Sequence, residues 1–296
     1  MKRLTYLLPL AAAVMLASCD RLDIAGMLVS SGSHTEDRVA MWLDWNAEQG
    51  EPVINGVPDE YSVYFCSDPH LNDSTDRMER FLTQECNDSK AIFAVINGDI
   101  ANESGERPYR LLDSVMRLPK FHTPAPRPVR DTCFAIIGNH DLYFDCEQYF
   151  QQYFHTSTYT VTVNTLGGAK DLFIFLDSGN GTHGRRQTEW LKEKLSHRSE
   201  YRHVVVATHT CLFRTTYNYS TTPAANLPLD EYYELTKLMD DSDVTLFVMG
   251  HFHYREERMI GNVPYVMTDN LDEDVEAPSY LIVTLGDEMA YKYKEL

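Results

Sequence analysis

Five short polar segments, each placed directly after an apolar run, constrain this chain more than any other feature of its sequence. Each run has the length and the Val, Ile and Phe content of a buried strand, so each segment is predicted to lie at a strand's carboxyl end. Loops there hold side chains on a rigid sheet and leave them accessible. The segments are Ser67-Asp68-Pro69-His70, Asn97-Gly98-Asp99, Gly138-Asn139-His140-Asp141, Thr208-His209 and Gly250-His251-Phe252-His253.

The side chains in these segments are carboxylates, imidazoles and an amide. Such oxygen and nitrogen donors suit manganese, iron and zinc, and no set of thiolates suggests a structural zinc site. On an extended backbone, His251 and His253 point to the same side, so each can reach one of two adjacent ions. A single segment of this kind indicates little, whereas five in one chain predict a metal centre.

In content and order, the five segments resemble the calcineurin-like metallophosphoesterase family, whose pattern is D-x-H, G-D, G-N-H-D/E, a lone His and G-H-x-H. The resemblance covers about residues 61–285. It implies an α/β fold of two facing mixed β-sheets flanked by helices, a four-layer α/β/β/α sandwich with metals at one edge. It also implies hydrolysis of phosphate esters by a hydroxide that bridges two divalent or trivalent ions of Mn, Fe or Zn.

The same resemblance assigns a role to each residue. Asp99 would bridge the two ions, because two close cations need a shared anion between them. His140 would protonate the departing alkoxide, and Asp141 beside it would orient the imidazole. The remaining ligands would be Asp68, His70 and His253 for one ion, and Asn139, His209 and His251 for the other.

Differences from the motifs of known branches of the family narrow the class of phosphoesterase that is expected. Protein phosphatases of this family carry G-D-x-x-D-R-G, but Asn102, Glu103 and Ser104 stand at the last three positions here. Purple acid phosphatases place a tyrosine where this chain has Asn102. The form G-D-x-x-N, together with segments 176–179 and 187–191, is similar to bacterial cyclic-nucleotide and general phosphoesterases. We therefore expect a phosphodiesterase or general phosphoesterase. A phosphomonoesterase and a non-catalytic cell-surface binding protein on the same fold are the alternatives.

Segment 210–228, after His209, should border the pocket. Arg214 could grip a phosphate oxygen and Tyr217 could stack on a base or sugar. An ordinary surface loop explains the segment equally well.

The amino terminus is typical of a bacterial lipoprotein. Lys2 and Arg3 precede a short apolar stretch, and Leu16-Ala17-Ser18-Cys19 resembles a lipobox. We therefore expect a signal peptide at 1–18, lipid on Cys19, and a membrane-anchored protein in the periplasm or at the cell surface. A plain secretory signal is the alternative. Residues 19–60 would form an anchor, linker and short helix at 36–49, and residues 61–296 the catalytic domain.

Within that domain the pattern alternates between strands and helices early and becomes strand-rich late, which indicates mixed sheets. Strands are expected at 62–66, 92–96, 133–137, 159–163, 172–176, 203–207, 245–249, 263–268 and 280–284. Helices are expected at 76–86, 107–117, 146–154, 185–196 and 229–239.

The net charge of the chain limits the kinds of molecule that it is expected to bind. The formal net charge of the 296 residues is -18, and no basic cluster follows the first residues, which argues against a nucleic-acid partner. The expected partner is a small phosphate ester. An acidic protein that binds such an anion needs a local positive charge, and bound cations provide one.

Overall fold

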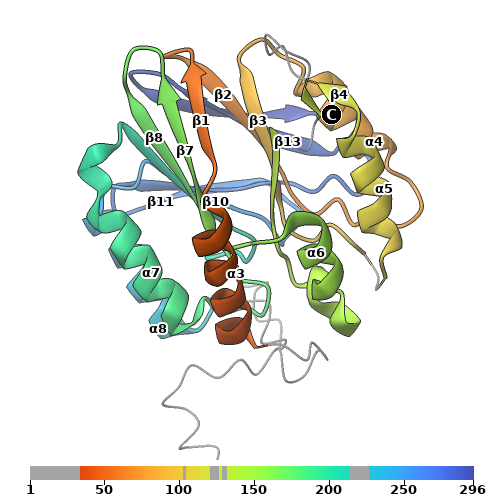
Figure 1. Cartoon of the computed structure of the whole chain (residues 1–296), viewed down its shortest axis with the longest axis horizontal. Helices are drawn as coiled ribbons and strands as arrows, with labels where there is room; N and C mark the ends of the chain where they lie inside the picture. Colours follow the sequence, from red (N-terminus) through yellow and green to blue (C-terminus); the bar gives the residue numbers. More distant parts are fainter. Residues whose placement is uncertain (1–33, 103–104, 121–126, 129–131, 214–226) are drawn as a thin grey trace, which may run out of the picture.

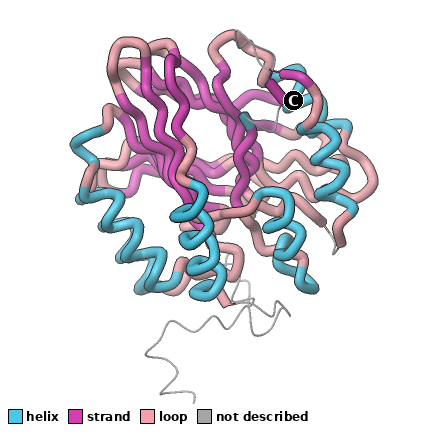
Figure 2. Tube along the Cα trace, viewed as in Figure 1, coloured by secondary structure: helices cyan, strands magenta, loops and turns pink. Residues whose placement is uncertain are grey.

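The computed structural model describes residues 34–102, 105–120, 127–128, 132–213 and 227–296. Within these residues two mixed β-sheets face each other (Figures 1 and 2). The larger sheet has seven strands, in the order β1 (Val53–Val57), β7 (Tyr159–Thr165), β8 (Lys170–Leu176), β9 (His203–Thr208), β10 (Leu246–Met249), β12 (Val263–Met267) and β11 (Glu256–Ile260). The smaller has five, in the order β14 (Met289–Glu295), β13 (Ser279–Leu285), β2 (Tyr61–Cys66), β3 (Ala91–Asn97) and β6 (Cys133–Ile136). A separate antiparallel pair joins β4 (Pro119–Lys120) to β5 (Arg127–Pro128).

Both faces of the smaller sheet are buried at its central strands, β13, β2 and β3. Because successive side chains of a strand point to opposite faces, Val63 and Phe65 of β2 enter the core between the sheets. Phe173 of the larger sheet lies in the same core. Tyr64 and Cys66 instead enter a second core, beneath the helices. A strand buried on both faces reads as a nearly continuous apolar run, which is why β2 was recognisable in the sequence.

Helices form the two outer layers. Figure 1 shows α7 (Gly184–Ser196) and α8 (Leu229–Asp241) on one side, and α4 (Asp76–Arg80), α5 (Arg107–Met116) and α6 (Glu147–Phe154) on the other. A π-helix, Phe81–Glu85, continues α4, and two 3₁₀ segments are His140–Asp145 and Arg198–Glu200. Leu191 and Leu235 anchor α7 and α8 on the larger sheet, and Leu112 and Phe150 anchor α5 and α6 on the smaller. The predicted four-layer sandwich is therefore confirmed.

The nine expected strands and the five expected helices of the catalytic domain are all present, within a few residues at their ends. The helix expected at 36–49 is α3 (Thr35–Gln49). Five strands were not expected: β1, β11, β14 and the short pair β4 and β5. The domain boundary was expected at residue 60. It falls between β1, which pairs in parallel with β7 of the larger sheet, and β2, which belongs to the smaller sheet.

Residues 1–33, with the expected signal peptide and Cys19, lie outside the described residues. None of the helices in the described part of the chain is both long and apolar enough to span a bilayer.

Candidate metal centre

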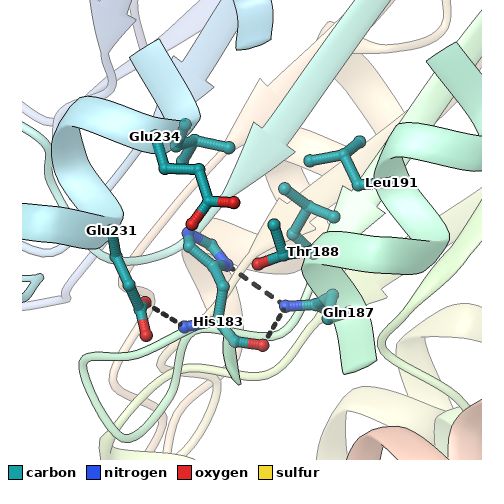
Figure 3. Close-up of a pocket in the computed structure, with 8 residues that line it drawn as sticks. His183, Gln187, Thr188, Leu191, Glu231 and Glu234 are labelled. Carbon is teal, nitrogen blue, oxygen red and sulfur yellow. Dashed lines mark hydrogen bonds between the residues drawn. The ribbon is translucent and has the colours of Figure 1, made fainter. Parts of the chain in front are cut away.

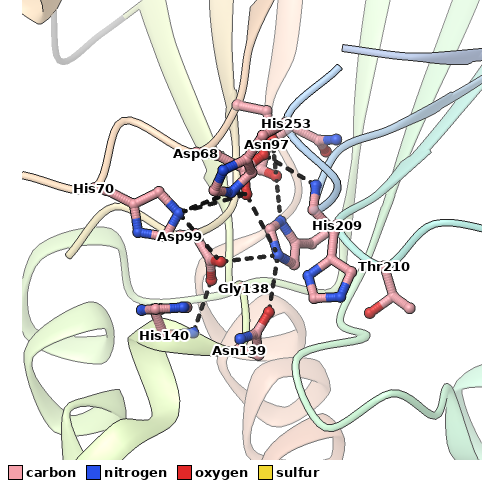
Figure 4. Close-up of polar contacts among 12 residues, drawn as sticks. Asp68, His70, Asn97, Asp99, Gly138, Asn139, His140, His209, Thr210 and His253 are labelled. Carbon is pink, nitrogen blue, oxygen red and sulfur yellow. Dashed lines mark hydrogen bonds and ion pairs between the residues drawn. The ribbon is translucent and has the colours of Figure 1, made fainter. Parts of the chain in front are cut away.

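The five ligand-bearing loops meet at one edge of the two sheets (Figure 4). Parallel strands β2, β3 and β6 end just before the loops at 67–70, 98–99 and 138–141. Parallel strands β9 and β10 of the other sheet end before His209 and before the loop at 250–253. All seven side chains expected as ligands thus lie at this edge, which is where open α/β sheets bind their ligands.

Within the centre, carboxylate oxygens and imidazole nitrogens form overlapping groups whose atoms all lie within 4.8 Å of one another. One group comprises Asp68, His70 and His253, another comprises Asp99, His209 and His251, and a third, of His70, Asp99 and His140, shares a residue with each. The carboxylate of Asp99 lies between them: its Oδ2 is 3.7 Å from His70 Nε2 and 3.3 Å from His209 Nε2. This position suits the bridging role expected for Asp99.

Asp68 provides the test of whether a cation fits. Its Oδ1 atom is buried and has no hydrogen-bond partner among the described residues. Three imidazole nitrogens nevertheless surround it, with His253 Nε2 at 3.3 Å, His70 Nε2 at 3.8 Å and His209 Nε2 at 3.9 Å. A buried oxygen without a donor is costly, and an ion held between these atoms would satisfy them all. The residues present therefore fit a metal.

Neighbouring backbone groups fix the orientation of the ligands. His209 Nδ1 donates to the carbonyl oxygen of Asn97 at 2.8 Å, which leaves the Nε2 lone pair directed into the centre. The Oδ2 atom of Asp68 accepts both the backbone N–H of His251, at 3.0 Å, and the hydroxyl of Ser67. Loss of such surrounding contacts typically weakens metal affinity by about 10–100-fold.

The backbone of the loops is itself unusual. Five of the seven expected ligands have a positive φ although they are not glycine: Asp68 (50°), His70 (42°), Asp99 (53°), His251 (80°) and His253 (59°). The left-handed region is disfavoured for residues with a Cβ, and such residues concentrate at functional sites. The strands on both sides must therefore impose this geometry.

Two glycines of the motifs are explained by close approach. A Cβ at Gly98 would overlap the imidazole of His209, and a Cβ at Gly138 would overlap the carboxylate and backbone nitrogen of Asp99. No side chain fits at either position while the ligands keep their places.

Electrostatics favour charged carboxylates here. Burial acts to raise the pKa of Asp68, but the nearby His209 and His253 outweigh it and lower the pKa to about 2. Burial likewise opposes the charge on Asp99, yet His209, His140 and His70 hold its pKa below the ordinary value. Burial acts to lower the pKa of His209, but Asp99 and Asp68 outweigh it and raise the pKa to about 10, so a bound cation would take the place of that proton between the two anions.

The hydrogen bonds of Asp141 go to groups other than the His140 ring, which it was expected to orient. The His140 Nδ1 atom instead lies 2.9 Å from the carbonyl oxygen of Asn102, and the His140 ring is half-buried and open to the centre. Asp141 is fully buried and accepts hydrogen bonds from four donors: Ile100 N, Ala101 N, Gly138 N and the Tyr109 hydroxyl. It therefore joins two ligand loops, and its role in orienting His140 stays a prediction.

Sequence reasoning missed Tyr143. Its hydroxyl accepts a hydrogen bond from Asn139 Nδ2 at 3.0 Å, and its ring lies 4.6 Å from the ring of His140. The motif ends at Asp141, and Tyr143 lies two residues beyond it, where the backbone leaves the helical conformation with φ -64° and ψ 132°. Arg214 and Tyr217, the expected substrate contacts, lie outside the described residues.

A two-sheet sandwich with clustered histidines and aspartates at one edge defines a class of metal-dependent hydrolase. A family model for the calcineurin-like phosphoesterases matches residues 61–255, and the chain belongs to that family. It is accordingly a hydrolase of phosphoric ester bonds. No curated protein matches the sequence.

Solved structures share the fold at low sequence identity. A dimetal phosphatase from Danio rerio superposes with a TM-score of 0.58 at 11% identity, covering 80% of this chain and 98% of that one. A purple acid phosphatase from yellow lupin gives 0.57 at 10% identity, with coverage of 80% and 52%. GAP50 of Plasmodium, described as the anchor in the inner membrane complex, gives 0.53 at 13%, with coverage of 80% and 84%.

Proposed function

We propose that this protein hydrolyses phosphodiesters at a centre of two metal ions. The convergence of seven oxygen and nitrogen donors on one sheet edge, with Asp99 between the two groups, supports two ions more than one. Asp68, His70 and His253 would hold one ion, and Asn139, His209 and His251 the other, with Asp99 shared. When bound, such a pair polarises the phosphoryl oxygens and activates a water molecule.

The chain's own residues would then position the ester and supply a proton. His140 stands beside the ligands without being needed in either set, and its Nδ1 is held by the Asn102 carbonyl oxygen. Its other nitrogen is thereby available to protonate the departing oxygen as a general acid. Asp141 would keep the loops of Asp99 and Asn139 together and would take no part in proton transfer.

Diesters are favoured over monoesters by charge. A phosphodiester carries one negative charge, whereas a phosphomonoester carries up to two. Protein phosphatases of this family bind the additional charge with a motif arginine, and this chain lacks that arginine. Arg214 and Tyr217 would contact the substrate from the segment after His209. Two alternatives give distinct results: a phosphomonoesterase, or a binding protein on this fold, for which GAP50 is a structural neighbour.

The experiment compares bis(p-nitrophenyl) phosphate with p-nitrophenyl phosphate, using purified protein with added Mn²⁺. We expect faster turnover of the diester, abolished by a chelator and restored by metal. Preferential turnover of the monoester would reject the diester assignment. No turnover of either ester, with metal bound, would favour the binding protein.

We also propose that the protein is exported and anchored to a bacterial membrane by lipid on Cys19. This rests on the amino-terminal sequence alone. A substrate would then be met outside the cytoplasm.

A further inference from the structure

Helix α3 contributes a buried ion pair to the sandwich. The guanidinium of Arg38 donates to both carboxylate oxygens of Asp177, with Nε to Oδ2 at 3.0 Å and Nη2 to Oδ1 at 3.1 Å. Trp42 Nε1 donates to the same Oδ2 at 3.0 Å. Both charged side chains are fully buried. Because such a pair loses its hydration on folding, stability alone is a weak reason for it, whereas its two-pronged geometry fixes an orientation.

Asp177 begins the loop that connects β8 to α7, and this loop contacts the segment of His209. The hydroxyl of Ser178 accepts the backbone N–H of Thr210 at 2.9 Å and the hydroxyl of Thr208 at 2.8 Å. The Thr210 hydroxyl in turn donates to the Ser178 carbonyl oxygen at 2.8 Å. Ser178 therefore holds the residues on both sides of His209.

The next residue of the loop contacts the segment of Asn139. Gly179 packs so closely that an added Cβ would lie 2.8 Å from Leu142 and 3.0 Å from the carbonyl oxygen of Gly138. The Gly179 N–H donates to Asp177 Oδ1 at 3.1 Å, so the carboxylate that binds Arg38 also sets the turn. The Asp177 loop thus contacts the chain beside both Asn139 and His209.

Gln187 of α7 holds the same loop from the other side. Its side chain accepts the Asp177 N–H at 2.9 Å and donates to the Asp177 carbonyl oxygen at 2.7 Å. It also lies against His183, as Figure 3 shows. Glu36 of α3 accepts the backbone N–H groups of Arg185 and Arg186 at the start of α7. Helix α3 thus contacts both the loop and the helix that follows it.

We propose that Arg38 and Asp177 are positioning residues for the metal centre, and that α3 is part of the catalytic unit although it precedes the matched region 61–255. Arg38 acts through Asp177 and the 177–179 loop on the ion that Asn139, His209 and His251 would hold. The inference rests on the proposed function in assigning an ion to those three residues.

The chain provides a matched control at the opposite end of β8. Arg202 donates to both oxygens of Asp171, which lies near the start of that strand, whereas Asp177 lies just past its end. The two carboxylates are about 20 Å apart, at roughly 3.3 Å per residue. Arg202→Met therefore removes a similar ion pair from the same strand without touching the ligand loops.

The test measures Mn²⁺ bound per chain, by equilibrium dialysis and electron paramagnetic resonance, in wild type, Arg38→Met and Arg202→Met. Measurements are made where circular dichroism shows each protein folded. We expect Arg38→Met to lose about 10–100-fold in affinity for one ion, the usual effect of removing a contact that orients a ligand. Arg202→Met should bind both ions as the wild type does.

Wild-type affinity in Arg38→Met, or an equal loss in both variants, would overturn the inference. If Arg38→Met does not fold, the double variant with Arg38→Gln and Asp177→Asn is measured in its place. The same affinity comparison with Arg202→Met then decides the inference. A wild type that binds fewer than two Mn²⁺ ions would instead reject the two-ion assignment, so the two failures are distinguishable.

Discussion

The Tyr143 hydroxyl receives the side-chain N–H of Asn139 at 3.0 Å, and this bond turns the Asn139 oxygen toward His209, whose Nε2 lies 3.2 Å from it. An asparagine side chain can present either its oxygen or its nitrogen, and only the oxygen can bind a cation. Tyr143 therefore selects the face of Asn139 that a metal requires.

Tyr143→Phe should weaken the binding of one metal ion and leave the binding of the other unchanged. The variant removes the acceptor but keeps the ring against His140, so affinity for the ion near Asn139 should fall by about 10–100-fold. Mn²⁺ titration followed by calorimetry measures this loss. Tyr153→Phe is the control, since that hydroxyl donates to Glu106 on the helical layer. Unchanged affinity in Tyr143→Phe would show that the amide is oriented by something else.

Asp99→Asn should lose metal as well as activity. Its carboxylate lies between the two groups of ligands, so one missing charge weakens both ions. Metal analysis of the dialysed protein and turnover of the diester are the measurements. Asp113→Asn, on α5 and paired with Arg117, controls for the substitution. A variant that retained two ions and normal turnover would exclude Asp99 as the bridge.

His140→Ala should slow hydrolysis while both ions stay bound. General acid catalysis contributes about 10²–10⁴-fold, and the contribution shrinks when the leaving group needs no proton. We therefore expect a small loss for nitrophenyl esters and a large loss for alkyl esters. Kinetics on the two ester classes, alongside metal analysis, check the prediction. Equal losses on both classes, or loss of metal, would assign His140 another role.

Asp141→Ala should destabilise the fold more than it alters proton transfer. It leaves four buried donors without an acceptor, and each costs about 1–3 kcal/mol, so the free energy of unfolding should fall by about 4 kcal/mol or more. Urea denaturation with metal present measures this. Tyr109→Phe, which removes only one of the four donors, should cost about 1 kcal/mol. If stability held and only the pH profile of turnover moved, the role expected from the sequence would be restored.

Cys19→Ala should abolish lipid attachment and release the protein from the membrane. The lipobox-like Leu16-Ala17-Ser18-Cys19 motivates this expectation. Labelling with a fatty-acid analogue in a bacterial host, followed by fractionation, provides the measurement. An unlabelled wild type would leave a plain secretory signal as the explanation.

The parts that the sequence could predict are those encoded locally. Buried strands such as β2 read as apolar runs, and the ligand motifs follow them directly. The strands that were missed are edge strands with exposed polar residues, as in β11 and β14, where no apolar run forms. Contacts between residues far apart in the chain could not be predicted from the sequence either. Arg38 and Asp177 are 139 positions apart, and nothing near either residue reveals the other.

The left-handed backbone at five of the expected ligands has a consequence for how this chain can change. Holding a residue with a Cβ in that region costs roughly 1–3 kcal/mol, which glycine would avoid. A change to glycine at any one of these positions would therefore give a chain that folds more easily but binds metal less well. Stability therefore does not explain aspartate or histidine at these five places, and the contacts of their side chains with the metal centre do.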